Sequence, residues 1–380
     1  MKTNLKFAAA LVAVSAMALA GCSSGSSSSE SSAAAPATSA AASAAASAAA
    51  SEAPASEAPA SEAPASEAMT SDAKVGLAYD IGGRGDQSFN DSAAAGLDQA
   101  VAEYGIETKE LEATGGETDA QKEERLTSLA EEGYNPIIAV GFAYSVAVDK
   151  VAKAFPDVNF AIVDDAASAL PNLANLVFAE NEGSFLVGAV AAQASKTGNI
   201  GFIGGVNVPL IQKFQAGYEA GAKAVNPDIT VQVKYLTEPP DFSGFGDPAK
   251  GKVAAEGMFQ GGADVVYHAA GGSGGGVFDA AVAAKGWAIG VDSDQFLTAS
   301  PDVKDVILTS MLKRVDVAVF DFVTSFVQGA PLTGVQTFDL AADGVGYSTS
   351  NPAVGEYTAK TDELAAQIID GTITVPDSMS

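Results

Sequence analysis

The sequence predicts an α/β protein whose folded part consists of two similar lobes, each built on a parallel β-sheet. From residue 74 onward, short apolar runs of strand length alternate with amphipathic stretches of helix length. The apolar runs are continuous, which is typical of parallel strands buried beneath crossover helices on both faces. They fall into two series separated by a long helical stretch near 182–195. One Rossmann domain would not use so many strands.

The elements follow one another in a regular order. In the first series we expect strands at 75–79, 108–111, 136–140 and 160–163, with helices at 92–104 and 119–132 and a third ending at 155. In the second series we expect strands at 200–203, 229–235, 265–267, 288–291 and 306–308, most of them separated by helices. In open sheets of this kind, ligands bind beyond the carboxyl ends of the strands.

The N-terminal region has a different character. Residues 1–21 resemble a lipoprotein signal peptide: Lys2 and Lys6 precede an apolar run at 7–20 that is too short to span a bilayer. The run ends in LAGC at 19–22, which looks like a bacterial lipobox and makes Cys22 the expected lipidated residue. Residues 22–72 are rich in Ser and Ala, with SEAPA repeats, and we expect a disordered tether. Residues 73–380 then form the two-lobed ligand-binding domain.

Composition excludes several classes of function. The chain carries 20 basic and 47 acidic residues, a net charge of −27, so it repels nucleic acids and anionic lipids. Contact with the membrane is therefore expected through the lipid anchor only. A single Cys and a single His exclude a disulfide, a thiolate metal cluster and a multi-histidine zinc site. No spacing favours a nucleophile with its base, and we expect neither an enzyme nor a cofactor.

Polar, glycine and aromatic residues follow the expected strand ends in both halves of the chain. Because these ends meet at one edge of each sheet, we expect the residues to face a common cleft suited to a polar, ring-containing ligand. They are Asp80 to Asn90, Gly141 and Phe142, Asp164 and Asp165, the Gly-rich run from His268 to Gly276, Asp292, and Lys313.

The motifs at these ends resemble the basic membrane protein (BMP, or PnrA-like) family of nucleoside-binding lipoproteins of ABC importers. The motifs occur in order: DIGG at 80–83, DQSFN at 86–90, FAIVD at 160–164, IGFIGG at 200–205, PLI at 209–211, DPAK at 247–250, YHAAGG at 267–272, GVDSDQ at 290–295, and TS at 309–310 with Lys313. The resemblance implies a type I periplasmic-binding-protein fold, in which two Rossmann-like lobes enclose a central cleft and are joined by a hinge.

The resemblance also implies how a base would be held. Phe89 would stack on one face of a purine, and Tyr267 or His268 on the other, with Phe142 as a second candidate. Gly272 would let the backbone approach the ligand closely. Phe214, in contrast, is expected to pack in the core.

Polar residues complete the implied site. Asp80 and Asn90 would read the edge of the base, although Asn90 is also suited to cap the helix that begins near 92. Asp164 and Asp292 would accept hydrogen bonds from ribose hydroxyls. Lys313 would bond a ribose oxygen or hold Asp292. Acidic contacts without a cluster of Arg and Lys argue against a phosphorylated ligand.

We therefore expect a monomeric lipoprotein on the outer face of the cell membrane that passes purine nucleosides to the permease and ATPase subunits of an ABC importer. The first lobe is expected at about 74–181 with a later returning segment, and the second at about 182–314 with part of the C-terminal region. A receptor of the same fold for a sugar or signalling molecule is the alternative, since fold alone does not determine the ligand. A nucleoside-processing enzyme is a third hypothesis.

Overall fold

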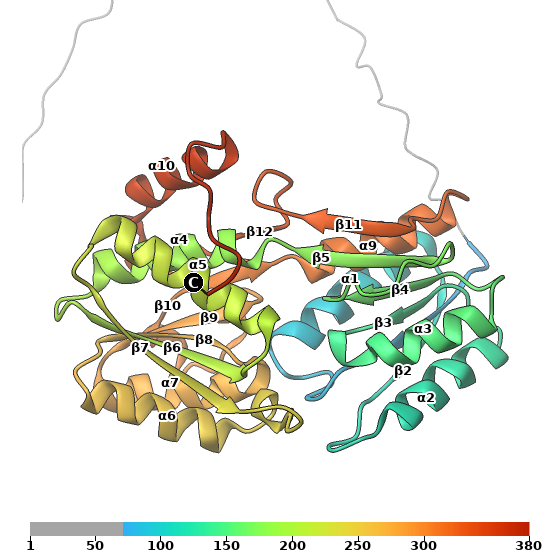
Figure 1. Ribbon diagram of the computed structural model, residues 1–380, viewed down its shortest axis with the longest axis horizontal. Coiled ribbons are helices and arrows are strands. Elements are labelled where there is room, and N and C mark those ends of the chain that lie inside the picture. The colour runs from blue at the N-terminus through green and yellow to red at the C-terminus, as the bar shows by residue number, and fades with distance from the viewer. Residues whose placement is uncertain (1–70, 380) are drawn as a thin grey trace, which may run out of the picture. The chain divides into compact units, whose positions relative to one another are not determined.

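The computed structural model describes residues 71–379, which fold around two six-stranded sheets (Figure 1). The strands of the first sheet all run parallel, each hydrogen-bonded to its neighbours. In spatial order they are β11 (Gly334–Phe338), β5 (Leu173–Phe178), β4 (Phe160–Val163), β3 (Ile137–Ala139), β1 (Lys74–Ala78) and β2 (Glu107–Leu111).

The second sheet repeats this order. Its strands are β12 (Val345–Tyr347), β10 (Ile307–Lys313), β9 (Trp287–Asp292), β8 (Val265–Ala269), β6 (Asn199–Val206) and β7 (Thr230–Thr237). All pairs are parallel except β12, which runs antiparallel to β10. The expected α/β fold with two lobes of parallel strands is confirmed.

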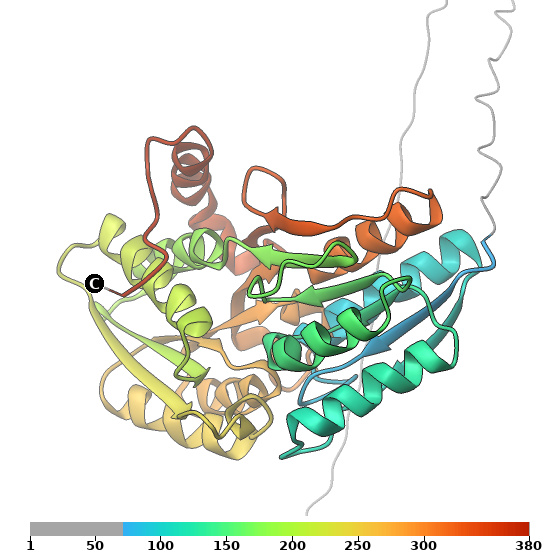
Figure 2. The ribbon, with the colours of Figure 1, turned by 45° about the vertical axis from the view of Figure 1, so that its right-hand side comes forward.

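Helices cover both faces of the first sheet, which explains why its inner strands are mostly apolar. On one face lie α1 (Phe89–Tyr104) and α9 (Val315–Val327), and on the other α2 (Asp119–Glu131) and α3 (Ser145–Ala154), side by side in Figure 2. Helices α1 and α9 approach so closely that a Cβ on Gly96 would lie 2.2 Å from the carbonyl oxygen of Asp316. Only glycine fits at such a contact.

The second sheet is covered in the same way. In Figure 1, α4 (Glu180–Ala194) and α5 (Pro209–Val225) lie above it, and α6 (Pro248–Gln260) and α7 (Gly274–Ala284) lie below it. The short helix α8 (Gln295–Thr298) follows β9, and α10 (Thr358–Ile369) packs near α4. Short 3₁₀ turns precede α3, α6 and α7, at 142–144, 243–245 and 271–273.

Within residues 71–379 the chain passes between the two sheets three times: from β5 into α4, from β10 into α9, and from β11 into β12. The first sheet therefore takes its sixth strand, and one of its covering helices, from the C-terminal part of the chain. We call the residues around the first sheet, with α9 and β11, the first lobe, and those around the second sheet the second lobe.

Several elements differ from the sequence predictions. Helix α1 begins at Phe89 and not near 92, and strands β8 and β10 run on to Ala269 and Lys313. Strands β5, β11 and β12 were not expected. These differences matter for the site, because they change which residues lie beyond the end of a strand.

The described part of the chain contains no helix that is long and apolar enough to cross a membrane. The expected signal peptide at 1–21, the lipidated Cys22 and nearly all of the tether at 22–72 lie outside the described residues.

Candidate functional site

A cavity lies between the two lobes, at the carboxyl ends of both sheets. It contains about 540 Å³ of space not filled by protein atoms, part of it open to solvent. The first lobe contributes Asp80, Ile81, Asp86, Phe89, Asn90, Gly141, Phe142 and Asp164. The second lobe contributes Leu210, Ile211, Phe214, Phe245, Ala269, Ala270, Gly271, Val291, Asp292 and Lys313.

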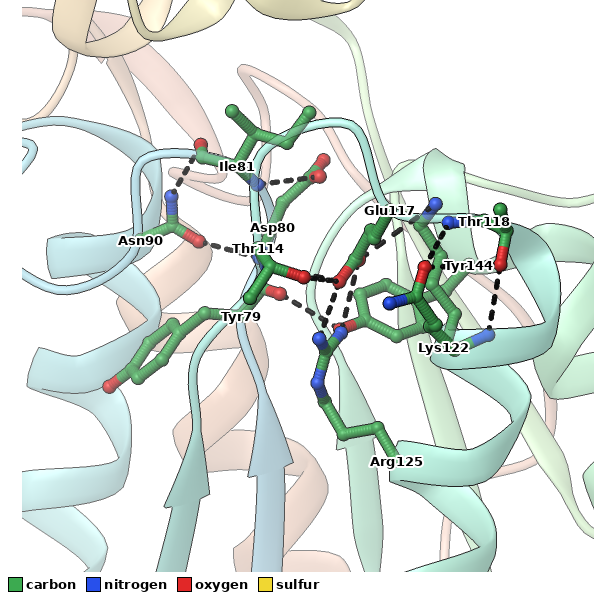
Figure 3. Close-up of polar contacts among 11 residues, drawn as sticks. Tyr79, Asp80, Ile81, Asn90, Thr114, Glu117, Thr118, Lys122, Arg125 and Tyr144 are labelled. Atoms are coloured by element: carbon green, nitrogen blue, oxygen red, sulfur yellow. Dashed lines mark hydrogen bonds and ion pairs between the residues drawn. The ribbon is translucent and has the colours of Figure 1, made fainter.

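Asp80 enters the cavity two residues after the end of β1 and is held by hydrogen bonds to Ile81 and Asn90 (Figure 3). Its Oδ1 accepts a hydrogen bond from the N–H of Ile81 at 2.8 Å, and its own N–H donates to Asn90 Oδ1 at 3.0 Å. A Cβ on Gly141 would lie 2.3 Å from Asp80 Oδ2, so the carboxylate fits against this glycine. Burial raises the pKa of Asp80 to about 6.

A buried polar cluster supports the end of β1 from behind (Figure 3). The Tyr144 hydroxyl donates to the carbonyl oxygen of Tyr79 at 2.9 Å. Arg125 in turn donates to the Tyr144 hydroxyl and to Glu117, both at 2.5 Å. Each side chain of this cluster has a charged or hydroxyl partner. The cluster therefore fixes the backbone at Tyr79, immediately before Asp80.

The start of α1 is held by Asp86. Its carboxylate accepts hydrogen bonds from the N–H groups of Ser88, Asn90 and Asp91 at 2.9–3.1 Å, and from the Asn90 side chain at 3.0 Å. The Asn90 side chain also donates to the Ile81 carbonyl at 3.4 Å. Both side chains are thus engaged in fixing the loop. Asn90 lies inside the first turn, and Ser88 occupies the N-cap position, so the sequence-based assignment of Asn90 as the cap was wrong.

Asp164 forms part of a buried chain of charges. Its Oδ2 lies 2.5 Å from the Lys313 ammonium, which is also 3.5 Å from Glu180, and Glu180 lies 2.8 Å from Lys213. The side chains of Asp164, Lys313 and Glu180 are 6%, 2% and 1% exposed. Burial raises the pKa of Asp164 and Lys313 opposes that rise. Oδ1 of Asp164 finds no hydrogen-bond partner among the described residues, which leaves it available to a ligand.

Asp292 has the equivalent position in the second lobe. Its Oδ2 accepts a hydrogen bond from the Ser88 hydroxyl at 2.6 Å. Burial raises its pKa to about 6. Asp164 and Asp292 both adopt left-handed backbone conformations, with φ of 68° and 65°, directly after or at the end of a strand. Such conformations are uncommon for residues other than glycine and gather at functional sites.

Aromatic rings form the apolar walls. Lys313 Nζ lies 4.9 Å from the centre of the Phe89 ring and 5.6 Å from that of Phe214. Phe142 of the first lobe meets Phe245 of the second edge to face, with ring centres 6.5 Å apart. The lobes therefore contact one another across the cleft, an arrangement we call closed.

Comparisons with known proteins agree with this architecture. The sequence profile of the family described as "ABC transporter substrate-binding protein PnrA-like" matches residues 73–379. This chain belongs to that family.

Relatives of this PnrA-like protein include the "CD4+ T-cell-stimulating antigen" of Listeria monocytogenes, which is 37% identical over 80% of this chain and 88% of its own length. The "ABC transporter nucleoside-binding protein BmpA" of Lactococcus lactis is 36% identical over 80% of this chain and 89% of its own. A solute-binding protein of an ABC transporter from Aeropyrum pernix has a similar solved structure, with a TM-score of 0.71 and 28% identity over 81% of this chain and 94% of its own. The type I periplasmic-binding-protein fold is thereby confirmed.

The structure of this PnrA-like protein brings seven of the ten predicted ligand residues to the cavity. They are Asp80, Phe89, Asn90, Phe142, Asp164, Asp292 and Lys313. Tyr267, His268 and Gly272 are not among the lining residues.

Tyr267 and His268 lie inside β8, and because successive side chains of a strand point to opposite faces, both are covered by helices. The Tyr267 hydroxyl bonds Ser184 at 3.2 Å, and the His268 ring packs 5.2 Å from that of Phe278. Burial lowers the pKa of His268 to about 4, so the ring is neutral at pH 7. Assigning either residue to the second stacking wall was wrong.

Sequence reasoning missed other lining residues. Phe245, expected nowhere in the site, reaches the cavity from the loop between β7 and α6. A pair of phenylalanines, Phe242 and Phe245, in a loop that is otherwise polar, Gly and Pro was the available signal. Phe214, expected to be a core residue, is 2% exposed and also lines the cavity. Apolar residues such as Ile81 and Leu210 carry no such signal.

Proposed function

We propose that this protein captures a purine nucleoside between its two lobes and delivers it to the permease of an ABC importer. The observation that carries the proposal is the pair Asp164 and Asp292, which face one cavity from opposite lobes beside the Phe89 ring. The nucleoside-binding name of the Lactococcus lactis relative supports the same ligand class.

The ribose would lie between the two carboxylates. Each has one oxygen engaged by the protein, Asp164 by Lys313 and Asp292 by Ser88, and its second oxygen remains for a ligand hydroxyl. Hydrogen bonds from hydroxyls to charged carboxylates are about twice as strong as those between neutral groups. A ligand with two neighbouring hydroxyls would therefore join the lobes.

The base would lie against Phe89, with Phe245 and Phe142 closing the apolar wall that Tyr267 and His268 do not reach. Stacking on aromatic rings contributes about 1–3 kcal/mol per base. The side chain of Asn90 is engaged with Asp86 and Asp80, so Asp80 would bind the edge of the base. Oδ1 of Asp80 already accepts a hydrogen bond from Ile81. Its Oδ2 would accept an N–H of a purine.

The charge of the cavity favours a ligand without phosphate. Four aspartates line it, Asp80, Asp86, Asp164 and Asp292, against the single ammonium of Lys313, which is already paired. A phosphate would bring negative charge close to buried carboxylates, where the repulsion is weakly screened. We therefore propose nucleosides and not nucleotides as cargo.

The cellular setting follows from the family and the N-terminal sequence. We propose that Cys22 carries the lipid anchor on the outer face of the membrane, and that residues 22–72 tether the binding domain within reach of the permease. Closure of the lobes around the ligand would create the surface that the permease recognises.

Isothermal titration of the purified full chain against inosine, guanosine, adenosine, free bases, ribose and nucleoside monophosphates tests the proposal. We expect dissociation constants in the micromolar range or below for nucleosides, and much weaker binding of the other ligands. Asp164→Asn and Asp292→Asn should each weaken nucleoside binding about tenfold or more.

Asp165→Asn is the matched control, since Asp165 neighbours Asp164 but accepts from Ser145 at 3.1 Å instead of facing the cavity. Tight binding of ribose without nucleoside would establish a sugar receptor in place of a nucleoside receptor. Equal affinity of the wild type and all three variants would remove these carboxylates from the site.

A further inference from the structure

Three hydrogen bonds of 3.0 Å or less join the lobes directly at one side of the cavity. The Ser88 hydroxyl donates to Asp292 Oδ2 at 2.6 Å, the Ser293 hydroxyl donates to the Ser88 carbonyl at 2.9 Å, and Gln295 Nε2 donates to the Gln87 carbonyl at 3.0 Å. Ser88, Gln295 and Asp292 are 0%, 2% and 7% exposed. We call these five residues the clasp.

The first-lobe side of the clasp is rigid. Asp86 fixes the N–H of Ser88, and Asp91 accepts from the N–H of Gln87 at 2.9 Å. Gln87 adopts a left-handed conformation with φ of 53°, which is uncommon for this residue type. The loop thus presents two carbonyls and one hydroxyl to the opposite lobe.

The second-lobe side is equally well held. The side-chain Oε1 of Gln295 accepts a hydrogen bond from the backbone N–H of Val291 at 2.9 Å. The backbone N–H of Gln295 donates to the Ser310 hydroxyl at 3.1 Å. Its side-chain amide therefore connects the end of β9 to the first lobe. Since both sides are fixed within their own lobe, closure of the lobes would bring all three pairs together at once.

We propose that Ser88 is a positioning residue that orients the Asp292 carboxylate from the opposite lobe, so that the clasp sets the lifetime of the ligand complex. The proposal rests on the proposed function in taking Asp292 as a ligand contact. In an open molecule Asp292 has lost the Ser88 hydroxyl, and only closure turns its second oxygen toward the cargo.

The clasp should affect the dissociation rate constant of the ligand but not its association rate constant. The ligand first meets the open molecule, in which the clasp is absent, so loss of Ser88 leaves the association rate constant unchanged. Release requires the clasp to break, so its loss accelerates dissociation. Removing a hydrogen bond to a charged group should raise the dissociation rate constant about tenfold.

Stopped-flow measurement of inosine association and dissociation on the full chain tests the proposal with four proteins: the wild type, Ser88→Ala, Ser293→Ala and Ser145→Ala. Ser145 is the matched control, since its hydroxyl bonds Asp165 within the first lobe. We expect faster dissociation by about tenfold for Ser88→Ala, a smaller increase for Ser293→Ala, and wild-type rates for Ser145→Ala. An unchanged dissociation rate in Ser88→Ala, or a loss confined to association, would overturn the proposal.

Small-angle scattering of the same four proteins without ligand distinguishes this proposal from the proposed function. If the wild type binds no nucleoside, the proposed function fails. The radii of gyration still test whether the clasp holds the two lobes together. A larger radius of gyration for Ser88→Ala and Ser293→Ala than for the wild type and Ser145→Ala then supports the clasp. Equal radii for all four then refute it.

Discussion

Replacing Lys313 by methionine should destabilise the fold strongly, and more so at alkaline than at acidic pH. Methionine keeps most of the length of the side chain but removes the ammonium that lies 2.5 Å from Asp164 and 3.5 Å from Glu180. Glu180 retains Lys213 at 2.8 Å, so Asp164 becomes the unpaired buried charge. Loss of one partner of a buried ion pair costs about 3–5 kcal/mol.

The pH dependence follows from the pKa of Asp164. Burial already raises this pKa, and without Lys313 nothing at this distance opposes the rise. A carboxyl whose pKa is higher in the folded than in the unfolded chain loses stability as pH increases from the unfolded pKa, about 3.9, at about 1.4 kcal/mol per unit until the folded pKa is reached. The wild type shares this loss up to its own raised pKa, so the deficit of the variant grows only above that pKa, by up to about 1.4 kcal/mol per unit, and should be larger at pH 8 than at pH 5.

Urea unfolding of the wild type and variant at pH 5 and pH 8 measures this difference. Adding Asp164→Asn to Lys313→Met should recover part of the loss at pH 8, because it removes the unpaired charge. Lys360→Met is the control: Lys360 pairs with Glu363 on the surface at 3.0 Å, and its loss should cost less than about 0.5 kcal/mol at either pH. An equal deficit for Lys313→Met at both pH values would show that this reasoning about the buried charges is wrong.

Three further predictions concern the cavity. Since burial raises the pKa values of Asp80 and Asp292 to about 6, and raises that of Asp164 as well, nucleoside affinity should be highest at alkaline pH and decline by about tenfold or more by pH 5, as titrations from pH 5 to pH 9 would show. Binding near pH 6 should also release protons, detectable as a dependence of the calorimetric heat on the buffer. Gly141→Ala, which would place a Cβ 2.3 Å from the Asp80 carboxylate at φ of 102°, should weaken binding and lower the melting temperature. Gly115→Ala, with nothing within 4 Å, should do neither. Phe245→Leu should weaken nucleoside binding by about 1–2 kcal/mol, measured by calorimetry. A comparable loss of affinity for free ribose would contradict the role of Phe245 beside the base.

The sequence indicated the fold well where apolar runs are continuous. The expected strand at 160–163 matches β4, Phe160–Val163, because both of its faces are buried and all four residues are apolar. Strand β5 was missed because Asn175 interrupts its apolar run; this asparagine is fully buried and donates to the Asp165 carbonyl at 3.1 Å. Strand β11 alternates between half-buried and exposed residues and pairs with β5 far away in the sequence, so no local pattern reveals it.

The site was predictable to the extent that strand ends were. Asp80, Asp164 and Asp292 were found because each lies within two residues of the end of its strand. Strand β8 continues two residues beyond its expected end, so His268 lies inside the sheet, and Tyr267, expected as the last residue of the strand, lies in its interior. Pairing across the lobes, such as Ser88 with Asp292 or Lys313 with Asp164, depends on how two separate sheets face one another, and spacing within one sequence does not encode that.

The three passages of the chain between the sheets leave from neighbouring strands, β5 and β11 in the first sheet and β10 and β12 in the second. Three connections along one border favour relative rotation of the lobes about that border. We expect Asp164 and Asp292 to move apart together in such a rotation. Ligand release would then occur in a single step. The distance between two fluorescent labels, one on each lobe, would report whether an individual molecule is occupied.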